Sequence, residues 1–228
     1  MDFGVITNSL KKGFEVWKNN LVAYIVAMLI IAIIVAILFS GAGLFGGFSL
    51  FTAIATGSQE GIGMGFAATG IALLMSLLVI GPLMFGFYYM AVKGTRGEKV
   101  EIKDLFYSFR SLGSYIRTLI FLIVYFILAV IFTIIPFIGN IIFMILFLYA
   151  VYIYIMTPSE GVVYALKESF NIAKDNLIIT IIACIVQYIL ILIGGIFFGL
   201  GLLVTLPIAY AFIVCVLKEL KPTIRDES

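Results

Sequence analysis

The chain has 228 residues, of which 64% are apolar and 11% are charged, with a formal net charge of +2. An ordinary soluble domain holds about 45 to 50% apolar and roughly 25% charged residues, and a protein of this size has too much surface to hide such an excess from water. The composition therefore excludes a soluble globular domain and predicts a protein whose solvent is lipid. It also excludes histidine chemistry, and two cysteines 31 positions apart, Cys184 and Cys215, form no disulfide framework.

Six stretches are long and apolar enough to cross a bilayer, because ~30 Å of hydrocarbon requires about 20 helical residues. They are Leu21–Phe39, a segment within Gly63–Val92, Ile116–Ile135, Phe137–Met156, Leu177 to about Ile193, and about Leu200 to Leu217. The sequence thus predicts an all-α polytopic membrane protein with six transmembrane helices in one domain, residues 1–228.

The basic residues all fall on one side of these spans. The 14 Lys and Arg lie before the first span, from the end of the second to the start of the third, where Arg117 is the second residue, between the fourth and fifth, and after the sixth, whereas Glu60 is the single charge on the other side. Short loops rich in Lys and Arg stay in the cytoplasm. This distribution predicts a protein of the cell membrane with both termini cytoplasmic. The 19-residue first span is too long for a signal peptide, whose apolar stretch runs ~7 to 15 residues.

An internal repeat precedes pairs of spans. Residues 9–21 align without a gap with residues 165–177, and the identical pairs are Leu10/Leu166, Lys11/Lys167, Phe14/Phe170, Lys18/Lys174, Asn20/Asn176 and Leu21/Leu177. A fainter third copy lies at Leu105 and Phe109. The pattern predicts three parallel repeats, over about 5–95, 100–157 and 158–221, each an amphipathic interfacial helix followed by a transmembrane hairpin.

Each amphipathic segment has apolar residues at helical spacing on one face and charges or amides on the other. Such helices lie in the membrane interface, where each Lys or Arg near an anionic surface adds ~1 kcal/mol. They either brace the spans or bind anionic lipid head groups. The candidate head-group residues are Lys11, Lys12, Lys18, Lys103, Arg110, Arg117, Lys167 and Lys174.

Polar chemistry within the spans is sparse. No ionisable Asp, Glu, Lys or Arg falls in the middle of a span, so we expect no enzyme activity, no catalytic residue, no cofactor and no metal site. Gln187 is the most polar residue at mid-span, and it either makes an interhelical hydrogen bond or lines a solute path. Pro82 and Pro207 mark either packed kinks or the kinks of a cavity-forming pair.

The segment from Ser40 to Ile62 is Gly-rich and carries Phe48 and Phe51 on the side opposite the basic loops. We expect it to lie among the head groups of the outer leaflet. A re-entrant plug and a surface for a partner are the alternatives.

The stretch Gly81–Phe109 combines a returning helix, a basic Gly-containing turn and the sequence Asp104-Leu105-Phe106. It resembles a signature of uncharacterised prokaryotic six-helix membrane proteins, and a similar module forms the membrane domain of some bacterial glycerophosphodiester phosphodiesterases. The resemblance implies a six-helix fold over the whole chain. It implies no activity, because catalysis in those enzymes belongs to a separate soluble barrel.

Taken together, the sequence predicts a non-enzymatic integral membrane protein whose cytoplasmic amphipathic helices engage anionic lipids, with a membrane-organising or lipid-sensing role. The alternative is a passive channel or transporter for a small neutral or amphiphilic solute. The expected partners are membrane lipids and not nucleic acid, and the sequence leaves open whether the chain forms a homo-oligomer.

Overall fold

A computed structural model of the chain describes residues 4–136, 138–196, 199–222 and 224, with the backbone only at 39, 41–46 and 73. Within these ranges the chain folds into helices and contains no strand. The elements are α1 (Gly4–Asn19), α2 (Leu21–Thr56), α3 (Gln59–Met75), the π-helical turn η1 (Ser76–Ile80), α4 (Gly81–Thr95), the 3₁₀ segment η2 (Ile102–Phe109), α5 (Leu112–Phe132), α6 (Ile138–Leu146), α7 (Ala150–Met156), α8 (Gly161–Asp175), α9 (Leu177–Ile196) and α10 (Leu202–Leu220).

Six helical stretches are long and apolar enough to cross a membrane: Leu21–Leu38, Gln59–Thr95, Leu112–Phe132, Ile138–Met156, Leu177–Ile196 and Leu202–Leu220. Each coincides with one of the six stretches that the sequence predicts. Phe137 and Arg225, at the start of one predicted span and in the basic C-terminal segment, lie outside the described residues. The prediction of an all-helical, multi-pass membrane protein is confirmed at this level.

The Gly-rich segment Ser40–Ile62, which we expected to lie among the head groups of the outer leaflet, is helical through most of its length. Helix α2 runs to Thr56, Gly57 takes the left-handed conformation (φ 70°) that a tight turn requires, and α3 begins at Gln59. A hydrogen bond from the Ser49 hydroxyl to the Gly61 carbonyl (3.0 Å) joins the two helices near the turn. With 36 residues, α2 is ~54 Å long at 1.5 Å per residue, well beyond the thickness of one hydrocarbon layer.

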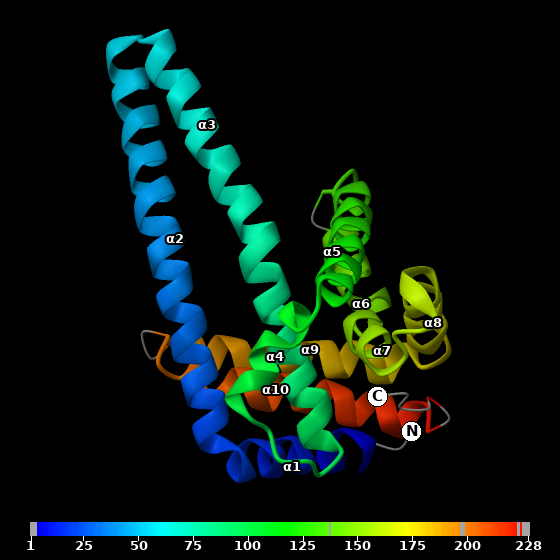
Figure 1. The fold of residues 1–228 in the computed structure, drawn as a ribbon. Coiled ribbons are helices and arrows are strands. Elements are labelled where there is room, and N and C mark those ends of the chain that lie inside the picture. Colours follow the sequence, from blue (N-terminus) through cyan, green and yellow to red (C-terminus); the bar gives the residue numbers. More distant parts are fainter. Residues whose placement is uncertain (1–3, 137, 197–198, 223, 225–228) are drawn as a thin grey trace.

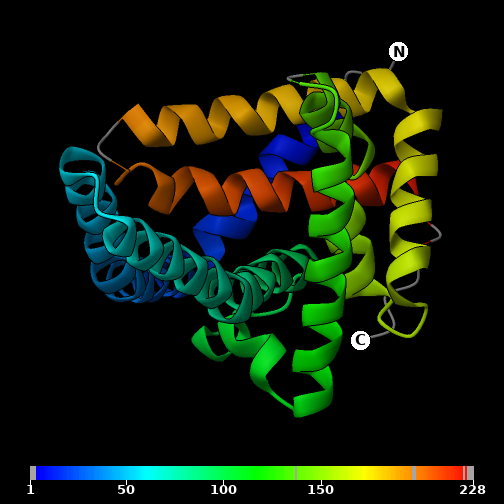
Figure 2. The same cartoon turned by 90° about the horizontal axis from the view of Figure 1, so that it is seen from above.

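The hairpins diverge from a common base. The α2–α3 pair rises away from the rest of the molecule, whereas α9 and α10 lie side by side and cross beneath it (Figures 1 and 2). Helix tilt is set by packing against neighbouring helices, and the outer part of the α2–α3 pair is packed mainly on itself. The described residues therefore do not form the closed parallel bundle that three parallel hairpins would suggest.

The core lies where the three returning helices meet. In α10, 61% of the apolar window is buried, and in the α6–α7 stretch 50%, against 17%, 11% and 17% in α2, α5 and α9. Phe87 of α4, Ile153 of α7 and Phe212 of α10 are all fully buried there. Each hairpin thus has an outgoing helix that faces outward and a returning helix that forms the core.

Each of the three returning helices has an irregular point, called an interruption below. In the first, the π-helical turn η1 ends two residues before Pro82, and in the third, Pro207 lies inside the continuous helix α10. The second has no proline there, yet α6 ends at Leu146 and α7 begins at Ala150. Proline removes an amide N–H from the helical ladder, which explains two of the three interruptions.

A charged element covers each interruption. The Ser108 hydroxyl of η2 donates to the Pro82 carbonyl (3.1 Å). In α8, the Ser169 hydroxyl donates to the Leu146 carbonyl (3.0 Å) and accepts the N–H of Tyr149 (3.2 Å). Helix α1 packs closely on α10 at Gly13. A Cβ added at Gly13 would lie 3.1 Å from the Ile208 carbonyl oxygen and 3.0 Å from the Phe212 nitrogen, so the lack of a side chain at Gly13 permits this close contact. Each charged element therefore packs on the returning helix of the preceding hairpin, and α1 packs on the last one.

Two local features differ from simple amphipathic helices. Segment η2 is a 3₁₀ helix with a non-helical residue at Phe106, and its capping box joins Glu101 and Asp104. Helix α8 begins at Gly161 (φ 84°) after Glu160, without a side-chain cap, because the Thr157 hydroxyl donates back to the Ile153 carbonyl (2.8 Å). Helices α1 and α8 end alike, since Asn20 and Asn176 each donate to the carbonyl four residues earlier, at 3.0 and 3.1 Å.

Candidate functional site

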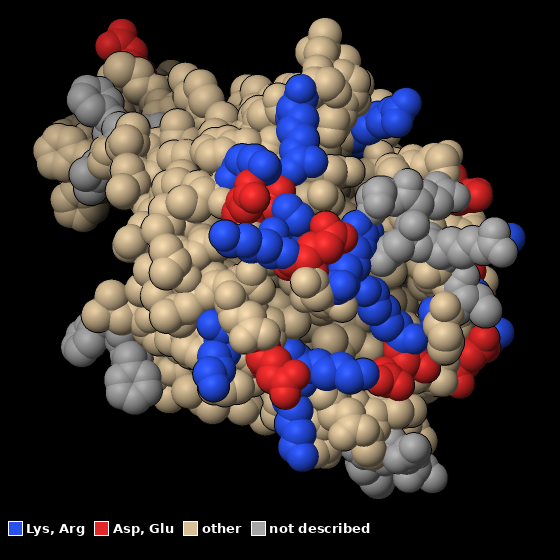
Figure 3. All heavy atoms as spheres, turned by 60° about the horizontal axis from the view of Figure 1, so that its bottom comes forward, with Lys and Arg blue, Asp and Glu red and all other residues tan. Residues whose placement is uncertain are grey.

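The charges gather on one face of the molecule, at the base from which the hairpins diverge (Figure 3). This charged face is formed by α1, η2, α8 and the adjoining ends of α4, α5 and α10. Lys, Arg, Asp and Glu are interspersed over it, so the face is a mosaic of both signs and not a uniform basic patch. Which cations are free for a ligand therefore depends on their individual partners.

The three charged elements bury the same positions. Ser9, Asp104 and Ala165 occupy equivalent places in η2 and the two helices, and each is fully buried. The next equivalent set, Gly13, Ser108 and Ser169, is buried one turn later, where it meets the interrupted returning helices. These positions hold the elements to the core.

The equivalent phenylalanines instead face outward. Phe14, Phe109 and Phe170 are 49%, 40% and 39% exposed. In α1 and α8 each phenylalanine lies between two exposed lysines at i−3 and i+4, namely Lys11 and Lys18 in α1, and Lys167 and Lys174 in α8. Residues at this spacing share one helix face. Both helices thus present the same outer stripe of lysine, phenylalanine and lysine.

Asp104 organises the charged face around η2. Its side chain is 1% exposed and accepts hydrogen bonds from Lys93 of α4 (2.7 Å), from Arg110 (2.8 Å) and from the Glu101 N–H (2.9 Å). A buried carboxylate is stable only when its charge is paired and hydrogen-bonded, and all three contacts serve that need. The cluster fixes η2 to the end of α4.

Arg110 also lies over two aromatic rings. Its guanidinium carbon is 5.1 Å from the Tyr89 ring centre and 5.3 Å from that of Tyr107, and the two rings stack at 4.1 Å. A hollow of about 560 Å³ opens beside this stack, and Lys103 and Phe106 line it along with Arg110. The contacts hold Arg110 in place at the wall of the hollow, where one of its guanidinium nitrogens donates to Asp104.

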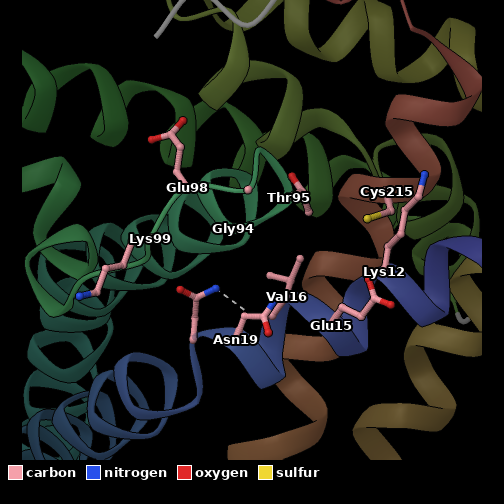
Figure 4. A pocket seen from close by; sticks show the side chains of 11 residues that line it. Lys12, Glu15, Val16, Asn19, Gly94, Thr95, Glu98, Lys99 and Cys215 are labelled. Atoms are coloured by element: carbon pink, nitrogen blue, oxygen red, sulfur yellow. Dashed lines mark hydrogen bonds between the residues drawn. The ribbon is translucent and has the colours of Figure 1, made fainter.

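A second hollow of about 380 Å³ lies between α1 and the turn after α4 (Figure 4). Two lysines, Lys12 and Lys99, and two glutamates, Glu15 and Glu98, line it together with amides, so its charges balance. Asn20 fixes this wall, since its amide oxygen accepts the Val100 N–H (2.9 Å). The balanced charge gives this hollow no preference for an anion.

All eight predicted head-group residues are exposed on the charged face. Three of them have acidic partners: Lys12 pairs with Glu219 (2.7 Å), Lys103 with Glu101 (2.5 Å) and Arg110 with Asp104. The partner Glu219 raises the pKa of Lys12, and Glu101 raises that of Lys103, so both lysines stay charged. The other five make no ion pair within the described part of the chain: Lys11, Lys18, Arg117, Lys167 and Lys174.

Pro82 and Pro207 are buried, and at Pro82 the surrounding hydrogen bonds are explicit. In a regular α-helix the Leu78 carbonyl would pair with the N–H that proline lacks, and the Tyr115 hydroxyl of α5 donates to this carbonyl instead (2.9 Å). Gln187 is half-buried on α9 and lines neither of the two hollows described above. Whether any of the three lines a solute path stays a prediction.

Sequence reasoning did not identify several residues that shape this face. Asp104 was noted as part of the Asp-Leu-Phe signature but was given no structural role. Its position three residues after Glu101 is the spacing of a capping box and could have indicated one. Ser108 and Ser169 were missed because nothing local marks a serine whose partner is a broken helix. A serine on the inner face of an amphipathic segment was the only signal.

Comparisons of the chain with protein-family models, with curated proteins and with solved structures found no match. The resemblance to uncharacterised six-helix membrane proteins stays a prediction, and the function has to be argued from the site itself.

Proposed function

We propose that the chain is a non-enzymatic integral membrane protein whose charged face engages anionic lipid head groups, with a membrane-organising or lipid-sensing role. The outer stripe of lysine, phenylalanine and lysine on α1 and α8 carries this proposal. An aromatic ring between two cations is suited to the interface, because the ring enters the acyl boundary while the ammonium groups stay among the head groups.

The position of these identities within the repeat adds support. Lys11, Phe14 and Lys18 match Lys167, Phe170 and Lys174, and all six are exposed. On the inner face Leu10 matches Leu166, and both pack against the core, but Ser9 and Gly13 correspond there to Ala165 and Ser169. The shared outer stripe is more than bracing of the spans requires.

We further infer a threefold repeat of charged element, outgoing helix and returning helix. The shared burial pattern of the three elements and the circular packing of each on the preceding returning helix support it. Under this arrangement the charged face lies on the cytoplasmic side of the cell membrane with both termini, as the distribution of Lys and Arg predicts.

The proposal is tested with the intact protein in lipid nanodiscs. Trp17, the single tryptophan, lies on α1 beside Phe14, with ring centres 5.5 Å apart, so it can report energy transfer to dansyl-labelled lipids. We expect stronger transfer to an anionic than to a zwitterionic labelled lipid. At ~1 kcal/mol per lysine, Lys11→Gln with Lys18→Gln lowers this preference roughly 30-fold.

The matched control is Lys12→Gln with Glu219→Gln, which alters the same helix but leaves the net charge unchanged. It is expected to keep the preference for anionic lipid. Equal transfer to both labelled lipids in the unmodified protein would refute the proposed function.

A further inference from the structure

A third hollow, the α5 cup, lies where α5 begins. It has a volume of about 290 Å³ and is enclosed by Tyr107 of η2, by Ser111, Ser114 and Arg117 at the start of α5, and by Tyr154 of α7. This is the low end of the size range for small-molecule pockets, so the cup has room for a head group and not for a whole lipid.

The α5 cup differs from the other hollows in its charge. Arg117 is its single charged residue among the described residues that line it, whereas acidic side chains line each of the two hollows described above along with the cations. A site that offers a cation without a carboxylate selects an anion. A bound anion pairs with the cation and meets no negative side chain that would repel it.

Hydrogen-bond donors supplement the arginine. Arg117 makes no ion pair with the described residues, and the Tyr107 hydroxyl makes no hydrogen bond within them. Burial raises the pKa of Tyr107, so its phenol keeps the proton that it can donate. The walls are fixed by their own contacts, since the Tyr154 hydroxyl donates to the Arg117 carbonyl (3.1 Å) and the Ser111 hydroxyl accepts the Ser114 N–H (3.0 Å).

Helix α5 also carries an exposed apolar stripe, which begins at Ile116, the residue before Arg117. Ile116, Ile120, Ile123 and Ile127 are 47%, 49%, 43% and 53% exposed, and their spacing places them on one side of the helix. A ligand with an anionic head in the cup and hydrocarbon chains on this stripe would match both surfaces. A free phosphate would use only the first.

We propose that the α5 cup binds the phosphodiester of one anionic phospholipid, with Arg117 as the charged ligand and the Tyr107 hydroxyl as a second donor, while the acyl chains lie along α5. The guanidinium fork suits two phosphate oxygens at once. This inference rests on the proposed function and adds to it a single selective site, distinct from the diffuse attraction of the surface lysines.

Native mass spectrometry of the full-length protein in detergent, titrated with phosphatidylglycerol, tests the cup. Arg117→Gln is expected to weaken binding of the first lipid at least tenfold, and Arg117→Lys three- to fivefold, because lysine keeps the charge but loses the fork. Tyr107→Phe, which retains the ring stacked on Tyr89, is expected to weaken binding about threefold. The control Lys99→Gln removes an exposed lysine of the charge-balanced hollow beside α1, outside both the cup and the lysine–phenylalanine–lysine stripes, and should stay within twofold.

Each outcome decides a different question. Equal losses for Arg117→Gln and Lys99→Gln would overturn the cup and leave the proposed function standing. Displacement of the lipid by millimolar inorganic phosphate would overturn the assignment to a phospholipid. If the unmodified protein bound phosphatidylcholine as tightly as phosphatidylglycerol, both this inference and the proposed function would fail. Tyr107→Phe removes a single oxygen, so it tests the cup even if Arg117→Gln does not fold.

Discussion

Neutralising Asp104 tests whether the charged face is built around one buried carboxylate. The Asp104→Asn variant keeps the shape of the side chain but leaves Lys93, whose side chain is 14% exposed, without its counter-charge. Removing one partner of a buried ion pair costs about 3 to 5 kcal/mol. Arg110 is 45% exposed and its part of the cost is largely screened by solvent, so we expect a loss of about 3 kcal/mol in the free energy of unfolding.

The assay is equilibrium unfolding in mixed micelles with increasing dodecyl sulfate, followed by far-UV circular dichroism. Lys12→Gln provides the comparison, because it breaks the exposed pair with Glu219 (side chains 57% and 38% exposed), which is worth at most ~1 kcal/mol. A double-mutant cycle with Lys93→Gln isolates the pairwise term. If Asp104→Asn cost no more than Lys12→Gln, or if the two changes in the cycle added without coupling, the reasoning from burial would be wrong.

Three further changes test the packing of the charged elements and the broken helices. Gly86→Ala would drive a Cβ into the Leu105 carbonyl of η2 and should lower the free energy of unfolding by about 3 kcal/mol or more. The control Gly63→Ala meets open space on exposed α3 and should be neutral or slightly stabilising. Similar effects at both sites would contradict the close approach of η2 to Gly86. Ser169→Ala leaves an N–H and a carbonyl unpaired between α6 and α7 and should cost about 2 kcal/mol by the same unfolding assay. Tyr115→Phe removes the donor to the carbonyl that proline leaves free and should cost about 1 kcal/mol, with an unchanged unfolding curve as the contrary result.

The spans were predictable because the signal for each is local. A run such as Leu177–Ile196 shows its length and hydropathy to anyone who reads the sequence, and the lipid solvent requires a helix there. The stripe on α1 and α8 was equally accessible, since Lys11, Phe14 and Lys18 recur as an ungapped match. The helical continuation of α2 into segment 40–62 was not foreseen, because many glycines are typical of turns, yet glycine also occurs frequently in helices that cross membranes. That the segment lies among the head groups stays a prediction.

The circular packing could not be read from any one segment. Gly13 and Phe212 are distant in the chain, and the interruption between α6 and α7 has no proline to mark it. The same holds for the α5 cup, because Tyr107 and Tyr154 come together only when α7 returns to the base.

The amino-acid sequence by itself determined the solvent of this protein, its six spans and the positions of its charged segments, because these depend on composition and on spacing within single helices. Only the tertiary structure decided which cations form ion pairs with acidic side chains and which do not, because ion pairing depends on the distances between elements. A lysine such as Lys11 and an arginine such as Arg110 look alike in the sequence. Their difference lies in whether a carboxylate such as that of Asp104 is folded against them.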